Sequence, residues 1–122
     1  MDKAVVVRFD IEAYKEYKNL QKAVKKGKKS KKKPTYEQLL NSIDNAIINM
    51  QTDYKYGVLI PKKYISKDTV KRYGTDKILR VELIGYWRLL YTIIGSEDEI
   101  IVIVLEYTDH DKYSKIFGYR KK

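Results

Sequence analysis

The fold of this chain is decided by residues 77–119, which read KILRVELIGYWRLLYTIIGSEDEIIVIVLEYTDHDKYSKIFGY. Apolar and polar residues alternate over residues 77–83 and again over residues 87–94, whereas residues 100–105 are aliphatic without a break. Alternation is typical of a strand with one buried face, and an unbroken apolar run is typical of a strand covered on both faces. The stretch therefore predicts three consecutive strands with a hairpin at residues 95–98. We expect the third strand to be central in the sheet and a short polar tail to follow it.

The residues before this stretch predict one further strand and two helices. Residues 4–9 are rich in Val and suit a strand, and apolar residues recur at helical spacing over residues 11–26 and 36–52. A capping box at Thr35 marks the start of the second helix. Residues 53–76 read as a connecting segment with a turn of helix. The predicted fold class is α+β, with an N-terminal strand and an antiparallel helical hairpin packed on an antiparallel sheet.

Length and composition exclude several classes of protein. At 122 residues the chain is expected to form a single domain over residues 1–122. It contains no Cys, which excludes disulfide frameworks, thiolate metal sites and cysteine nucleophiles. No apolar run is long enough to span a bilayer, and the first ten residues lack the pattern of a signal peptide. We therefore expect a soluble, cytoplasmic protein that does not act at a membrane and needs no metal or cofactor.

The charge is the strongest compositional feature. The chain has 26 basic and 16 acidic residues, a net charge of +10, and residues 25–33 read KKGKKSKKK. This excess predicts a polyanionic partner, with nucleic acid favoured over membrane because no basic helix carries a strong apolar face. The alternative is a solvated turn with no partner. The candidate RNA-binding residues are Lys25, Lys26, Lys28, Lys29, Lys31, Lys32, Lys33, Lys62, Lys63, Lys71 and Arg72.

A family resemblance is carried by three segments and by the order of the elements. Residues 85–91 read GYWRLLY, residues 107–113 read YTDHDKY, and residues 117–119 read FGY. Together with the order strand, helical hairpin, then antiparallel strands, these segments resemble the RelE/ParE superfamily of toxins from bacterial and archaeal toxin–antitoxin modules. The resemblance implies an mRNA interferase that cleaves messenger RNA on the ribosome and is held inactive by a cognate antitoxin protein.

The resemblance also implies roles for individual residues. Arg88 stands at the position of the family's strand arginine, which contacts the scissile phosphate, Arg80 stands near a lysine of the preceding strand, and Tyr113 stands near a C-terminal tyrosine. The sequence departs from RelE at two places. Glu82 replaces a second lysine, and Asp109-His110 replaces a C-terminal arginine. A carboxylate with a histidine looks more like the YoeB branch of the family.

The residue types fit the chemistry of RNA cleavage. Attack by the 2′-hydroxyl requires a base, an acid and cations that stabilise the charge on phosphorus. His110 carries an imidazole, a side chain that can serve as acid or base. Glu82 can act as the base if an adjacent cation or burial shifts its pKa. Arg88 can bind phosphate oxygens bidentately, and Tyr113 can stack on a base or donate a proton.

Purely structural interpretations stay open. His110 can be an ordinary surface histidine, and Arg80 with Glu82 can form a weak ion pair on a solvated strand. Tyr113, Phe117 and Tyr119 can simply pack the last segment on the sheet. Two other functions fit the same fold. One is a non-catalytic, ParE-like inhibitor of DNA gyrase, and the other is a basic nucleic-acid-binding module without catalysis.

Overall fold

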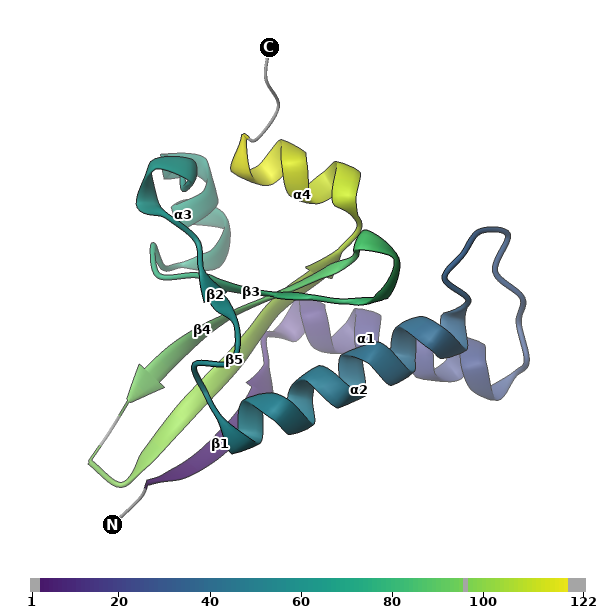
Figure 1. The fold of residues 1–122 in the computed structure, drawn as a ribbon, viewed down its shortest axis with the longest axis horizontal. Helices are drawn as coiled ribbons and strands as arrows, with labels where there is room; N and C mark the ends of the chain where they lie inside the picture. The colour runs from purple at the N-terminus through teal and green to yellow at the C-terminus, as the bar shows by residue number, and fades with distance from the viewer. Residues whose placement is uncertain (1–2, 96, 119–122) are drawn as a thin grey trace.

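The computed structural model of the chain describes residues 3–95 and 97–118 (Figure 1). In chain order the elements are β1 Ala4–Phe9, α1 Ile11–Lys25, α2 Tyr36–Thr52, β2 Val58–Leu59, the 3₁₀ turn η1 Lys62–Tyr64, α3 Lys67–Tyr73, β3 Leu79–Glu82, the 3₁₀ turn η2 Ile84–Tyr86, β4 Arg88–Gly95, β5 Glu99–Thr108 and α4 His110–Phe117. None of the helices in these two ranges is both long enough and apolar enough to cross a membrane.

The sheet is mixed rather than antiparallel. Its strand order is β1-β5-β4-β3-β2, and β1 pairs with β5 in parallel from Ala4 opposite Glu99 to Phe9 opposite Val104, whereas the other neighbours are antiparallel. The prediction of a wholly antiparallel sheet was therefore wrong. Parallel neighbours need a long connection. Here the two helices and the rest of the chain provide it.

The third predicted strand, β5, lies between β1 and β4, so the middle position of the sheet belongs to β4. The expectation that residues 100–105 form the central strand was thus wrong by one place. The physical reason for that expectation is nevertheless correct, because β5 is an interior strand with apolar side chains on both faces. The predicted hairpin at residues 95–98 includes Ser96, which lies outside the described residues.

Helices cover both faces of the sheet (Figure 1). The α1 and α2 helices pack on one face, where side chains such as Leu89, Tyr91 and Val104 are buried against them. The α3 and α4 helices lie over the other face, where Leu90 and Leu105 are buried. The prediction that the third strand is covered on both faces is confirmed. Burial of these alternating side chains is the main source of the fold's stability.

A β-bulge in β5 changes which side chains face α3 and α4. Leu90 is opposite Glu106, but the next residue, Tyr91, is opposite Val104, so β5 has one extra residue at this point. Because of that extra residue, Leu105 and Glu106 both reach the second face, and Thr108 follows them opposite Arg88. The bulge therefore determines how the end of β5 meets the strand that carries Arg88.

The predicted polar tail is a helix, α4. Asp109 caps its N-terminus by accepting a hydrogen bond from the Lys112 N–H at 2.9 Å, and Gly118 ends it in the left-handed conformation at φ 64°. Tyr113 and Phe117, one turn apart, are each 1 % exposed against the sheet. The segment is helical because this apolar pair needs burial and both ends are capped. Tyr119 lies outside the described residues.

Candidate active site

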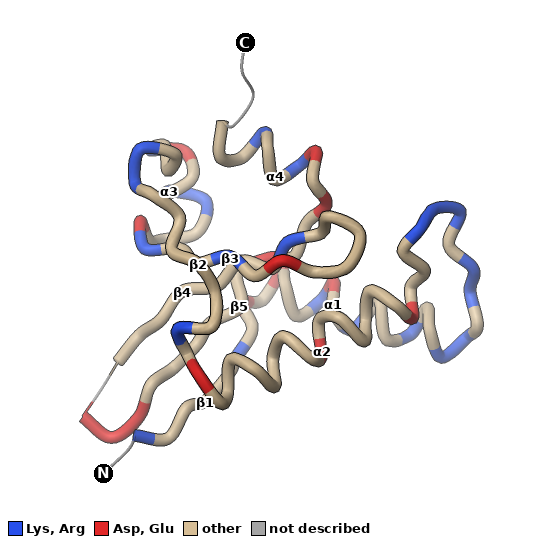
Figure 2. The backbone as a smooth tube through the Cα atoms, in the orientation of Figure 1, with Lys and Arg blue, Asp and Glu red and all other residues tan. Residues whose placement is uncertain are grey.

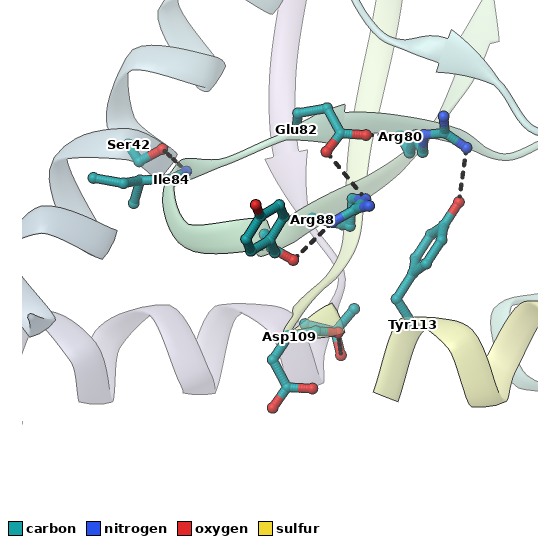
Figure 3. Close-up of polar contacts among 9 residues, drawn as sticks. Ser42, Arg80, Glu82, Ile84, Arg88, Asp109 and Tyr113 are labelled. Atoms are coloured by element: carbon teal, nitrogen blue, oxygen red, sulfur yellow. Dashed lines mark hydrogen bonds and ion pairs between the residues drawn. The ribbon is translucent and has the colours of Figure 1, made fainter. Parts of the chain in front are cut away.

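The candidate site is built on the charged end of β3 and β4. Glu82 of β3 is directly opposite Arg88 of β4 in the sheet, and Arg80 lies two residues before Glu82 on the same face. Glu82 bridges the two arginines, with 3.2 Å from its Oε1 to Arg88 Nε and 3.3 Å from its Oε2 to Arg80 Nε (Figure 3). The predicted pairing of Glu82 with Arg80 is present, and it extends to Arg88.

Tyr113 of α4 packs against the same two arginines. Its hydroxyl accepts a hydrogen bond from Arg80 Nη1 at 3.0 Å, and its ring centroid lies 5.0 Å from the Arg88 Cζ atom and 5.9 Å from that of Arg80. Cations over an aromatic ring are attracted by its quadrupole. Because Tyr113 is 1 % exposed, its ring cannot stack on a base in this conformation. The geometry instead supports a role that was not predicted from the sequence, the positioning of both guanidinium groups.

Arg88 is held more firmly than Arg80. Its side chain is 13 % exposed, compared with 28 % for Arg80, and its Nη1 donates a hydrogen bond to the Tyr86 carbonyl at 2.7 Å. The buried Arg88 Nε lies close to Glu82 without the alignment of a hydrogen bond, so this contact is an ion pair. A guanidinium group fixed in this way is preorganised to meet an anion.

His110 is the first residue of α4 and is exposed to solvent. Two residues earlier, Thr108 pairs with Arg88, so the end of β5 brings the histidine to the same edge of the site. Its imidazole ring meets the Tyr86 ring edge-on, with 6.4 Å between centroids. The neighbouring Asp109 carboxylate caps α4 and accepts the Lys112 N–H. The structure therefore assigns Asp109 to positioning the start of the helix that carries His110.

The lysine loop, residues 26–34 between α1 and α2, lies beside this edge. Its side chains at Lys28, Lys29 and residues 31–33 are exposed, and Figure 2 shows them gathered at one end of the molecule. The loop, the turn η2 and the start of α4 line a groove of about 550 Å³ that includes Tyr86 and His110. The structure thus brings the predicted basic segment and the predicted histidine together.

The other predicted RNA-binding residues lie elsewhere. Lys62 and Lys63 are in η1, and Lys71 and Arg72 are in α3, away from the lysine loop (Figure 2). Lys62 forms an ion pair with Asp76 at 3.4 Å, and Arg72 Nε lies 3.5 Å from Glu106 Oε1. These residues do not form one surface with the lysine loop, because α3 packs over a different part of the sheet.

Sequence reasoning missed a second polar cluster, centred on Glu106. This carboxylate is 11 % exposed, accepts a hydrogen bond from the Tyr73 hydroxyl, and forms ion pairs with Arg72 and Lys112. Burial and the hydrogen bond to Glu106 raise the pKa of Tyr73 well above its ordinary value of 10.0, so the phenol stays a donor. The sequence contained one signal for this cluster, the lone carboxylate of Glu106 at the end of an apolar strand. A buried carboxylate of this kind must be paired.

Across residues 3–95 and 97–118, no three His, Asp or Glu side chains gather in a way that would hold a metal ion. The candidate site consists of two arginines, one carboxylate and a nearby imidazole.

The comparisons with known proteins identify the fold. No protein-family model matches the sequence, and no curated protein matches it with significance. A YoeB/ParE toxin from Agrobacterium tumefaciens has a similar structure, with a TM-score of 0.54, 14 % sequence identity, and coverage of 86 % of this chain and 98 % of that chain. The chain has the fold of the RelE/ParE toxin superfamily, as the sequence resemblance predicts.

Proposed function

We propose that this chain is the toxin of a type II toxin–antitoxin module and acts as an endoribonuclease that cuts messenger RNA on the ribosome. The observation that carries the proposal is the convergence of Arg80 and Arg88 on Glu82, with Tyr113 packed against both guanidinium groups. The similarity in fold to a YoeB/ParE toxin supports the toxin class. One fold can carry more than one activity, so the fold does not decide between them. The choice of a nuclease is instead supported by the side chains of the site.

The reaction forms a bond between the RNA 2′-oxygen and phosphorus and breaks the bond from phosphorus to the 5′-oxygen. Its products are a 2′,3′-cyclic phosphate and a free 5′-hydroxyl. One group must take the proton of the 2′-hydroxyl, and another must give a proton to the leaving 5′-oxygen. Extra negative charge develops on the phosphate oxygens in between, and fixed cations stabilise it.

Each requirement is matched by a described side chain. Arg88 and Arg80 bind the phosphate oxygens, which draws their guanidinium groups away from Glu82. The released Glu82 carboxylate, 58 % exposed in the structure, then accepts the 2′ proton, and His110 donates a proton to the 5′-oxygen. Tyr113 does not react in this scheme. It holds the two arginines in place through its ring and hydroxyl.

The proposed function also specifies the partners of the protein. The substrate is messenger RNA on the ribosome, and a cognate antitoxin protein keeps the toxin inactive. An acidic antitoxin segment would complement the lysine loop, whose charge is not neutralised by any ion pair among the described residues.

The experiment that tests this function is primer extension on a defined message in a translation extract, with and without ribosomes. We expect the wild-type protein to cut within codons only when ribosomes are present. Arg88→Ala should lower the cleavage rate by about 10²–10³-fold, because a preorganised group that stabilises transition-state charge is removed. His110→Ala should lower it by about 10²–10⁴-fold, as expected for loss of a general acid.

Arg8→Ala is the matched control. Arg8 is an exposed arginine of β1, two strands away from β4, so its removal changes the net charge equally without touching the site. Its cleavage rate should equal that of the wild type. Full-length message in every lane, from protein shown to be folded, would contradict a nuclease. A supercoiling assay with DNA gyrase would then test the non-catalytic alternative.

A further inference from the structure

Tyr86 is the most exposed large apolar side chain among the described residues, at 76 %. Its backbone lies in the left-handed region, with φ 65°, and it is the only described residue other than glycine with a positive φ. This conformation is unfavourable for a side chain with a Cβ, and it persists only where the surroundings enforce it. The exposed ring gains no burial from this strained turn, so packing does not explain why a tyrosine occupies the position.

The turn is fixed to its neighbours on both sides. Ser42 of α2 accepts a hydrogen bond from the Ile84 N–H at 3.0 Å (Figure 3), and the Arg88 guanidinium binds the Tyr86 carbonyl. Gly85, at φ 67°, passes so close to the end of the lysine loop that a Cβ there would lie 2.6 Å from Pro34 Cδ. The turn is therefore clamped between α2, the lysine loop and the arginine of the site.

The clamped turn places the Tyr86 ring in a defined environment. Tyr86 lines the groove of about 550 Å³ between the lysine loop and the start of α4, and the edge-on neighbour of its ring is His110. The Tyr86 carbonyl accepts a hydrogen bond from Arg88, so the residue that carries the ring directly contacts one of the two arginines that we propose to bind phosphate. An acidic segment, residues 97–99 at the start of β5, lies at the opposite end of the molecule from the lysine loop (Figure 2). This distribution of charge therefore attracts a polyanion to the end of the molecule where the lysine loop and Tyr86 lie.

We infer that Tyr86 is a stacking platform for an unpaired base of single-stranded RNA, with the lysine loop holding the phosphates next to that base. Single-stranded nucleic acids are bound by this combination of a cationic track with an exposed aromatic ring, and stacking requires a base released from its pair. The inference rests on the proposed function, because it names how the substrate is held at that site. It gives Tyr86 the stacking role that the burial of Tyr113 excludes.

Binding of a non-cleavable RNA tests the inference separately from catalysis. The probe is a single-stranded oligonucleotide with every 2′-hydroxyl methylated and with 2-aminopurine at one position, so that stacking quenches its fluorescence. We expect Tyr86→Ala to weaken binding by about 5- to 150-fold and to abolish the quenching. Tyr86→Phe keeps the ring and should bind within about 2-fold of the wild type. Tyr56→Ala, at an exposed tyrosine before β2, is the matched control and should bind as the wild type does.

Two further variants separate stacking from charge and from folding. Tyr86→Gly removes the ring and relieves the strained φ, so the melting temperature should rise while binding weakens as it does for Tyr86→Ala. Replacing Lys31, Lys32 and Lys33 with Ala should weaken binding without changing the quenching per bound oligonucleotide. It should also reduce the slope of log affinity against log salt by about 2, given roughly 0.7 per lost phosphate contact on a single strand.

The outcomes distinguish the inference from the proposed function. If Tyr86→Ala bound the oligonucleotide with the same affinity and the same quenching as the wild type, the stacking role would be overturned, even if the protein cuts RNA. An absence of oligonucleotide binding by the wild type would overturn it as well. Binding and quenching that depend on Tyr86, in a protein that cuts no message, would support the stacking site and contradict the nuclease.

Discussion

The two faces of the sheet are made from alternate residues of the same strands, yet they differ in what they bury. Under α1 and α2 the strands present a continuous apolar surface that includes Val81, Leu89 and Val104. Under α3 and α4 the apolar cluster ends partway along β3 and β4, and Arg80, Glu82 and Arg88 take over. The comparison shows that the larger apolar cluster lies on one face, while the charged end of the other face is available for chemistry.

The largest contrast is expected between two neighbouring residues of β4 that point to opposite faces. Leu89 is fully buried, so Leu89→Ala should lower the free energy of unfolding by about 2–5 kcal/mol, as for other buried leucines. Arg88→Ala should change it by only about 1 kcal/mol, since its partner Glu82 is exposed. Urea denaturation followed by circular dichroism measures both values. Equal losses of stability would contradict the division between the two faces.

The two carboxylates of the second face provide a contrast of intermediate size. Glu106→Gln should lower the free energy of unfolding by about 1–3 kcal/mol, because the charges of Arg72 and Lys112 lose their buried partner, and it should leave RNA cleavage unchanged. Glu82→Gln should do the opposite, with near-normal stability and cleavage lowered by about 10²–10⁴-fold through loss of the base. The two variants should be compared by urea denaturation and primer extension. Strong loss of cleavage in Glu106→Gln would place this carboxylate in the reaction instead.

The smallest expected effect is a pH dependence on the face under α1 and α2. Burial, together with the hydrogen bond from the Tyr17 hydroxyl to Asp44, raises the pKa of Tyr17 from 10.0 to about 12. The unfolded chain releases this proton at lower pH than the folded chain does, so the unfolded state binds fewer protons in this range. The contribution is complete below pH 10 and is lost as the pH rises to about 12.

Urea denaturation across that range should show the fall in stability, and Tyr17→Phe should make the curve flatter. An equally steep curve in Tyr17→Phe would assign the effect to the other tyrosines whose pKa values burial raises, namely Tyr73, Tyr91 and Tyr107.

Local patterns in the sequence were sufficient for much of the fold. The capping box at Thr35 and Gln38 sets the start of α2, and α2 runs over residues 36–52 as predicted. The alternation in β3 and β4 correctly separates the core side of each strand from the side that carries Arg80 and Arg88. These features depend on residues close together in the chain, so a single sequence reveals them.

Features that depend on distant segments were not predictable in this way. The parallel pairing of β1 with β5 joins residues about a hundred positions apart, and no local pattern specifies its direction. The bulge that turns Glu106 inward is visible only in the pairing of β5 with β4. The helix α4 was locally encoded by Asp109, Tyr113, Phe117 and Gly118, but its polar residues suggested a tail.

The candidate site was predicted in part. Arg80, Glu82 and Arg88 meet as their positions on adjacent strands require. The burial of Tyr113 and the exposure of Tyr86 could not be read from the sequence, because both depend on how α4 and η2 pack. The proximity of the lysine loop to His110 likewise follows from the contact between Pro34 and Gly85, which are far apart in the chain.

The central claim is that RNA binds at the charged end of the second face and not on the face under α1 and α2. Backbone amide NMR spectra, recorded as the methylated single-stranded oligonucleotide is added, test it most directly. We predict that the largest changes occur at residues 28–33, 84–88 and 109–112, while the exposed Ile48 of α2 is unaffected. Changes centred on α1 and α2, or no changes at any oligonucleotide concentration, would contradict this account.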